Sequence, residues 1–185
     1  MRTFRILPAL LLIGAAPTHR YTLDAKESAI SAKVAFFGLA SKSAGFPRAS
    51  GGITLSPDAR ERIDLVVTLD ATALTAPDSV TLARLKGPNF FDVARYPTVT
   101  FRGRTMRMTS DRHAEVAGQI TARGVTKPAI LTVRFAAPPA RADGTRPLVL
   151  TGETVIDRRD FGITAYPFIV GRKVAITIRA AMVPS

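Results

Sequence analysis

Asp157 and Asp160 come nearest in this sequence to a catalytic pair. Two carboxylates three residues apart can serve as a general acid and a general base. Here they flank Arg158 and Arg159, and adjacent guanidinium groups keep carboxylates ionised. That arrangement suits a salt-bridged turn better than a tuned acid. We therefore predict a structural turn, in which Gly162 releases the chain from a strand.

The remaining reactive residue types are sparse. The chain has 2 His, no Cys and no Trp. His113 lies beside the Ser110-Asp111-Arg112 turn signal and His19 near the N-terminus, so neither has a second ligand placed to hold a metal ion. The sequence also lacks a Gly-x-Ser-x-Gly elbow and a phosphate-binding glycine loop. It therefore predicts no catalytic residue, no metal site and no cofactor, and it favours a binding protein over an enzyme.

Aromatic side chains are concentrated in one short stretch. The chain has 10 Phe and 3 Tyr, and four of these rings fall between Phe90 and Phe101. Such rings at strand ends usually fill a core, but they can also line a cavity. Both interpretations stay open at the level of the residues.

The elements that must position these rings are mostly strands. Apolar residues alternate with a period of two from Tyr21 onward, as in Ile63, Leu65, Val67 and Leu69. We expect about eight short antiparallel strands, which close into a barrel or pack as a sandwich. Turn signals separate them, including Gly51-Gly52, Ser110-Asp111-Arg112, the loop 138–147 and Val170-Gly171-Arg172.

One helix is predicted directly before the aromatic stretch. Asp78 or Ser79 provides its N-cap, Leu82 and Leu85 form its apolar stripe, and Lys86-Gly87-Pro88 ends it.

The N-terminus resembles an export signal. Arg2 and Arg5 precede an apolar run from Ile6 to Ala16, which is too short to span a membrane. We predict a signal peptide at residues 1–18, a single domain at residues 19–185, and a periplasmic protein. The net charge of +12 comes from scattered basic residues, which argues against a nucleic-acid site and leaves attraction to anionic head groups as an alternative.

Three segments together resemble the YceI family of periplasmic proteins, described as lipocalin-like polyisoprenoid-binding domains. They are LKGPNFFDVARYP (residues 85–97, leading to Thr100-Phe101), GQITARGVTKP (residues 118–128) and RRDFG (residues 158–162). The resemblance implies an all-β fold, an antiparallel eight-stranded lipocalin-like barrel with one short helix. It also implies a long apolar cavity that binds an isoprenoid, such as a quinone or polyprenyl lipid, and it does not imply an enzyme.

The pattern and the resemblance together predict the residues of the cavity or its entrance. These are Phe36, Leu39, Phe46, Leu85, Phe90, Phe91, Phe101, Val116, Ile120 and Phe161. Family members often carry His where Phe36 and Arg84 stand, and an Arg-Asp pair where Thr81-Leu82 stand. We expect these positions to be neighbours. Arg84 is then a candidate partner for a phosphate or quinone oxygen, although a solvated helix charge is an equal alternative.

Two functions from different classes follow. The first is periplasmic binding, sequestration or transport of an isoprenoid or similar long apolar lipid. The second is a stress-related interaction protein with a barrel filled by side chains, which docks on an anionic membrane surface or a protein partner. A barrel with a hydrophobic mouth also makes a homodimer plausible.

Overall fold

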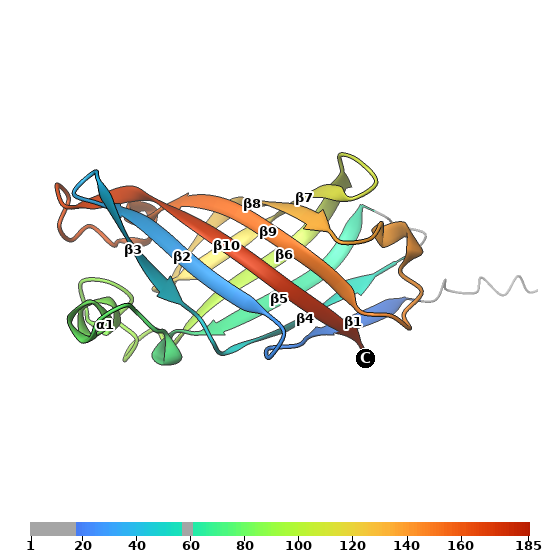
Figure 1. Ribbon diagram of the computed structural model, residues 1–185, viewed down its shortest axis with the longest axis horizontal. Coiled ribbons are helices and arrows are strands. Elements are labelled where there is room, and N and C mark those ends of the chain that lie inside the picture. The colour runs from blue at the N-terminus through green and yellow to red at the C-terminus, as the bar shows by residue number, and fades with distance from the viewer. Residues whose placement is uncertain (1–17, 57–60) are drawn as a thin grey trace, which may run out of the picture.

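The structure is a computed structural model that describes residues 18–56 and 61–185. The predicted signal peptide, except for Thr18, lies outside these residues. The described chain contains ten strands, one α-helix and three 3-10 turns (Figure 1). The strands are β1 (His19–Leu23), β2 (Ala29–Phe36), β3 (Ala40–Gly45), β4 (Ala49–Leu55), β5 (Arg62–Asp70), β6 (Thr98–Met108), β7 (His113–Ala122), β8 (Val125–Phe135), β9 (Leu148–Asp157) and β10 (Val170–Pro184). The helix is α1 (Ser79–Lys86), and the turns are η1 (Ala71–Ala73), η2 (Pro139–Arg141) and η3 (Arg158–Phe161).

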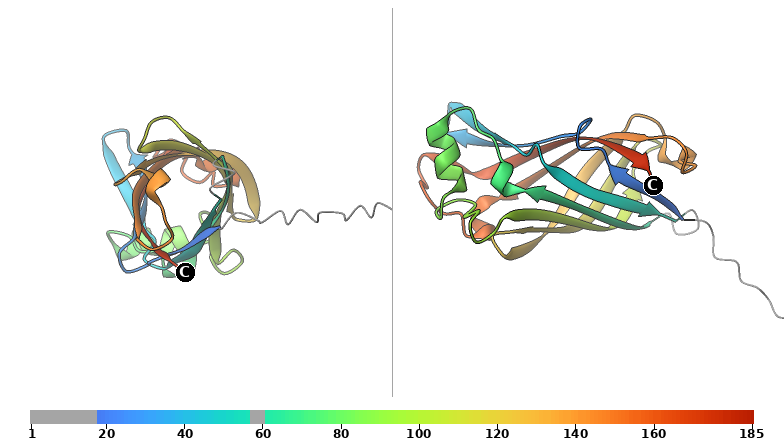
Figure 2. Two further views of the ribbon diagram at one scale, coloured as in Figure 1. Left: turned by 90° about the vertical axis from the view of Figure 1, so that its right-hand side faces the viewer. Right: turned by 90° about the horizontal axis from the view of Figure 1, so that it is seen from below.

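Eight of the strands close a barrel. The order is β1-β4-β5-β6-β7-β8-β9-β10, and β1 also pairs with β10, which joins the two ends. Every pairing is antiparallel. Figure 2 shows the resulting ring of strands end-on. The predicted all-β fold, an antiparallel eight-stranded lipocalin-like barrel with one short helix, is confirmed.

The β2–β3 hairpin adds to the barrel at one end only. The long strand β10 pairs with β1 through Met182–Pro184 and with β2 through residues 170–179, so the two partners share one edge of β10. Only one isolated bridge, between Gly45 and Thr75, continues from β3 toward η1 in the described chain. The barrel is therefore closed by a strand ladder at the β1 end, and by this single bridge together with side chains at the hairpin end.

The period-two pattern separates the inside of the barrel from the outside. On β7, Val116 and Ile120 are buried while Ala117 and Gln119 are exposed. On β8, Val133 is buried and its neighbour Arg134 is exposed. The apolar face of each strand points inward because burying apolar surface is the main favourable contribution to folding.

Two expected turns are part of strands instead. Gly51 and Gly52 lie within β4, where a Cβ atom on Gly51 would stand 2.1 Å from the Val66 carbonyl oxygen. A Cβ atom on Gly52 would stand 2.8 Å from the Tyr21 carbonyl oxygen. These glycines allow close backbone approach to β5 and β1. Val170-Gly171-Arg172 begins β10, and the register with β2 shifts there, so this segment is a bulge.

Helix α1 begins and ends as predicted. The Asp78 side chain is the N-cap and accepts a hydrogen bond from the backbone N–H of Thr81 at 2.7 Å. This bond, supported by the ammonium group of Lys42, lowers the pKa of Asp78 to about 2. The backbone N–H of Gly87 closes the other end. No helix among the described residues is long and apolar enough to cross a membrane.

Candidate ligand-binding cavity

An internal cavity of about 120 Å³ runs along the inside of the barrel. All eight barrel strands contribute to its wall. Thr100 and Thr154 are the only polar residues of the lining that the structure describes, and none is charged. The wall includes Leu23, Ile53, Leu65, Val67, Phe101, Met106, Val116, Ile120, Leu131, Val133, Phe135, Leu150, Ile176, Ile178, Ala180 and Met182. This wall can hold apolar groups, and it offers no acid, base or nucleophile apart from the two hydroxyls.

Phe101, Val116 and Ile120 are the residues of the predicted set that line this cavity. They are brought together by the pairing of β6 with β7, in which Phe101 lies opposite Ile120. Most of the wall was not named from the sequence, because periodicity fixes one face of each strand without showing how the strands surround a space.

A pair of glycines makes room for these side chains. Gly103 and Gly118 lie opposite each other on β6 and β7. A Cβ atom on Gly118 would stand 2.8 Å from Cζ of Phe101, and one on Gly103 would stand 2.8 Å from Cγ1 of Val116. Glycine inside a strand often marks such close approach, so these two positions were the signal that could have located this part of the wall.

Phe46, Phe91 and Leu85 lie at the α1 end of the barrel. Phe46 is buried with Ile30, Ala44 and Leu74, and Leu82, Leu85 and Phe91 pack against this group. The Phe46 and Phe91 rings meet edge to face with centroids 5.9 Å apart. Together these side chains fill the gap that the strands leave open between β3 and β4.

Phe161 closes a neighbouring part of the same end, and a buried arginine holds it there. Phe161 packs with Ile120 and Ala122. Arg158, only 3% exposed, donates hydrogen bonds to the carbonyl oxygens of Ile163, Val170 and Gly171 at 2.7, 2.8 and 2.8 Å. Burial lowers the pKa of Arg158, and the charge of neighbouring Arg159 lowers it further. Arg158 therefore clamps both ends of the loop between η3 and β10.

Asp157 and Asp160, the carboxylates considered as a catalytic pair, belong to the turn at η3. Asp157 accepts a hydrogen bond from the backbone N–H of Arg159 at 3.0 Å and pairs with Arg172 at 2.7 Å. These contacts lower the pKa of Asp157, the backbone N–H having the larger effect. Asp160 is exposed on η3. The geometry thus matches the predicted salt-bridged turn, and Gly162 ends it with a left-handed backbone at φ 73°.

The other four residues of the predicted set lie at the α1 end and do not line the internal cavity. Leu39 is completely exposed in the β2–β3 turn. Phe90 stacks on Tyr166 with centroids 6.1 Å apart, and the guanidinium of Arg84 lies 5.6 Å from the same Tyr166 ring. Phe36 is half-buried on β2.

Phe36 and the helix that carries Leu82 lie at the same end of the barrel and are connected through Lys42. The Lys42 ammonium is 5.7 Å from the centre of the Phe36 ring. The same ammonium forms an ion pair with Asp78, the N-cap of the helix that carries Leu82.

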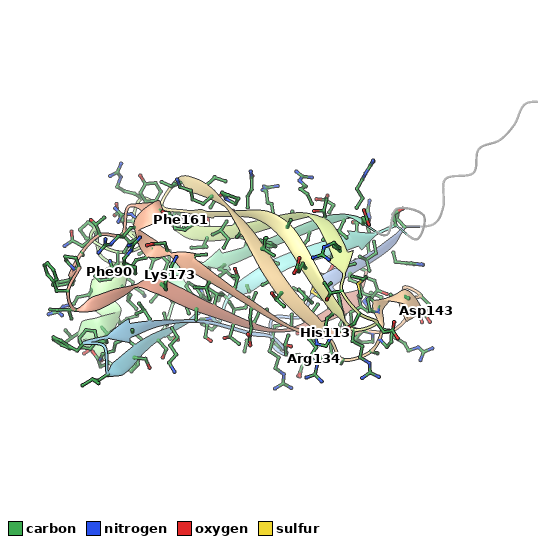
Figure 3. The ribbon with its side chains drawn as sticks, turned by 90° about the horizontal axis from the view of Figure 1, so that it is seen from above. Phe90, His113, Arg134, Asp143, Phe161 and Lys173 are labelled. Carbon is green, nitrogen blue, oxygen red and sulfur yellow. The ribbon has the colours of Figure 1, made fainter. Side chains whose placement is uncertain are left out.

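A second hollow, of about 670 Å³, forms a mouth at the opposite end of the barrel. It shares Leu55, Met106 and Pro139 with the internal cavity, so the two spaces adjoin. His19, Arg62, Ser110 and Asp111 add polar groups to it. Figure 3 shows the two ends, with Phe90, Phe161 and Lys173 at one and His113, Arg134 and Asp143 at the other.

The loop beside this mouth is fixed to the barrel by a tyrosine. Tyr21 is 1% exposed, and its hydroxyl accepts a hydrogen bond from the backbone N–H of Gly144 at 3.0 Å. The loop between β8 and β9, which contains Gly144, is thereby held at the end of the barrel.

The closed barrel, its apolar interior and its partly polar mouth define a lipocalin-like binding fold. The chain belongs to the YceI family, since the model of the YceI-like domain matches residues 21–182. This confirms the resemblance found in the sequence. A UPF0312 protein of Ectopseudomonas mendocina is 22% identical over 161 residues, which are 86% of this chain and 84% of the relative.

Solved structures show the same fold. BcnA of Burkholderia cenocepacia superposes with a TM-score of 0.76 at 19% identity, covering 86% of this chain and 98% of BcnA. A polyisoprenoid binding domain from Saccharophagus degradans, implicated in plant cell wall breakdown, superposes with a TM-score of 0.69 at 14% identity. That match covers 89% of this chain and 98% of the other.

Proposed function

We propose that this protein binds an isoprenoid or similar long apolar lipid inside the barrel, as a periplasmic carrier or sequestering protein and not as an enzyme. The observation that carries the proposal is the internal cavity, whose described lining has no charged residue and only two hydroxyls. A polyisoprenoid binding domain with the same fold supports this ligand class. Transfer of the chain out of water contributes about 25 cal/mol per Å² of apolar surface.

The size of the cavity indicates how the ligand must be accommodated. A volume of about 120 Å³ is below the roughly 300–1,000 Å³ typical of small-molecule sites. Met106 and Met182 belong to the wall, and unbranched methionine side chains rearrange readily. We therefore propose that the chain enters by displacing wall side chains and extends into the adjoining mouth.

The mouth suits the polar end of such a lipid. Ser110, Asp111, Arg62 and His19 line it next to the apolar Leu55 and Met106. In this arrangement the chain lies along the Phe101, Val116 and Ile120 wall, while the Phe46 and Phe91 rings close the far end. Arg84 lies outside the cavity, so in our proposal its contact is with lipid head groups near the α1 end.

Lipid extraction followed by mass spectrometry tests the proposal on protein purified from its own host. We expect an isoprenoid or other long-chain lipid at about one molecule per barrel. Consistently empty protein, together with no uptake of added polyprenol, would favour the interaction protein with a filled barrel. Whether the chain forms a homodimer is a separate question, which light scattering of the same preparation answers.

A further inference from the structure

Two loops at the α1 end of the barrel expose large apolar side chains at their tips. Leu39 in the β2–β3 turn is 100% exposed, and Phe168 in the loop between η3 and β10 is 97% exposed. Phe37 and Tyr166 beside them are 63% and 41% exposed. Single exposed apolar residues are ordinary, but a group of them at one end of a molecule marks an interaction site.

The two loops form one surface. The backbone N–H of Phe37 donates a hydrogen bond to the carbonyl oxygen of Ile169 at 2.8 Å, which ties the hairpin turn to the second loop. Phe90, which follows α1, stacks on Tyr166. Figure 1 shows the β2–β3 turn, the start of β10 and α1 at the same end of the barrel. We call Phe37, Leu39, Tyr166 and Phe168 the apolar tips.

The backbone holds these tips in place at a cost to stability. Phe37 and Tyr166 have left-handed backbones, with φ of 51° and 53°. That region is unfavourable for bulky side chains, and such strain concentrates at functional sites. The second loop is also clamped at both ends, by the hydrogen bonds from Arg158 to Ile163 and Val170. Phe37 and Tyr166 pack on Phe36 and Phe90. Leu39 and Phe168 beside them are almost completely exposed, which points to a contact outside this chain.

Positive charge lies around the apolar tips. Arg84, Arg159 and Lys173 form no ion pair with any residue in the described part of the chain. Asp78 and Asp157 at this end are each paired with a cation of the chain. Asp160 is exposed there and offsets part of the positive charge. The chain as a whole carries a net charge of +12. A second copy docked on the same surface would bring these unpaired cations together, whereas an anionic bilayer would neutralise them.

We propose that the apolar tips insert into the interface of an anionic lipid bilayer, with Arg84, Arg159 and Lys173 contacting its head groups. Projecting side chains suit a bilayer better than a flat protein surface, because lipids can move aside around them. The docking would place the carrier at the source of its ligand, and to that extent it rests on the proposed function. The insertion itself requires no lipid inside the barrel.

Vesicle flotation tests this proposal with the full mature chain. The vesicles are phosphatidylcholine with or without phosphatidylglycerol, and they contain no isoprenoid. We expect binding to the mixed vesicles that weakens as salt is added. The double variant Leu39→Ser, Phe168→Ser should bind about tenfold or more weakly, because it removes two inserted apolar groups. The control Ile130→Ser, Val155→Ser changes residues that are 59% and 62% exposed elsewhere on the barrel, and it should bind like the parent chain.

Charge and insertion can be measured separately. Arg84→Gln with Lys173→Gln should weaken binding to the mixed vesicles several-fold and leave binding to pure phosphatidylcholine unchanged. Because the chain has no Cys, Phe168→Cys gives a single site for an environment-sensitive fluorophore. Its emission should shift to the blue on mixed vesicles, and the same label at Val155→Cys should not shift.

The same variants distinguish a failure of membrane docking from a failure of lipid binding inside the barrel. The double variant Leu39→Ser, Phe168→Ser, which we call the tip variant, should still take up detergent-solubilised polyprenol, since its cavity is unchanged. Equal binding of the tip variant and the parent chain, or no binding of the parent chain to anionic vesicles, would overturn membrane docking. Membrane docking would also be overturned if the parent chain were a dimer that bound no vesicles and the tip variant were a monomer. The surface would then be an interface between two copies of the chain.

Discussion

The rings of Phe46 and Phe91 meet edge to face, with centroids 5.9 Å apart and planes at 79°. Phe46 follows β3, and Phe91 follows α1. Their contact joins two segments far apart in sequence, where no ladder pairs β3 with β4 in the described chain. At this end of the barrel, aromatic packing adds to the single backbone bridge between Gly45 and Thr75.

A double-mutant cycle measures what this contact contributes. Phe46→Leu and Phe91→Leu should each destabilise the fold, and their coupling in urea unfolding should be about 0.5–1.5 kcal/mol, as for other aromatic pairs. Additive effects would show that the two rings act independently, and the contact would then not help to close this end.

The buried guanidinium of Arg158 should matter far more than its exposed neighbour. Arg158→Met removes three hydrogen bonds to backbone carbonyls and should lower the free energy of unfolding by roughly 3 kcal/mol or more. Arg159→Met is the matched control and should change it by about 0.5 kcal/mol or less, as is usual at the surface. Equal costs for the two variants would contradict the clamp.

The N-cap of α1 predicts a dependence of stability on pH. The pKa of Asp78 is about 2 in the folded chain against an ordinary 3.8, so the folded state binds this proton less readily than the unfolded state. Its stabilising contribution is present above about pH 4 and is lost as the pH falls toward 2. Thermal unfolding of Asp78→Asn should therefore lack part of the acid-induced loss of Tm seen in the parent chain. Parallel pH profiles would show that this carboxylate is not the source.

Much of the fold could be predicted because its signals are local. The alternation along β7 and β8 follows from burial of one face, and the cap of α1 follows from Asp78 and Gly87. The motif RRDFG was correctly interpreted as a turn, and Asp157 before it is held by the backbone N–H of Arg159 and by an ion pair with Arg172. The role of Arg158 in holding the following loop could not be predicted. Only the fold shows that its guanidinium is buried against the carbonyl oxygens of Ile163, Val170 and Gly171.

The candidate site was harder to predict because it depends on pairing between distant strands. Phe90, Phe91 and Phe101 were all predicted to lie at the cavity or its entrance, yet they lie in different places. Phe101 lines the cavity, Phe91 helps to close the barrel, and Phe90 stacks outside on Tyr166. Gly51 and Gly52 were misread as a turn, since glycine marks close backbone approach as well as reversal.

In our proposal a long apolar chain lies inside the barrel, and two neighbouring alanines on β10 allow the volume of that space to be changed with a matched control. Ala180 lines the cavity and is 5% exposed, whereas Ala181 lies opposite the exposed Val149. Ala180→Leu therefore reduces the internal space, and Ala181→Leu adds the same atoms outside it.

The most direct test is equilibrium binding of polyprenols of increasing chain length to the parent chain and these two variants. For the parent chain and Ala181→Leu, affinity should rise at least about tenfold with each added isoprene unit until the cavity is full, since each buried CH₂ contributes about 0.8 kcal/mol. Ala180→Leu should bind long chains about tenfold or more weakly while remaining folded. An affinity that does not depend on chain length, or that falls equally for both variants, would contradict binding inside the barrel.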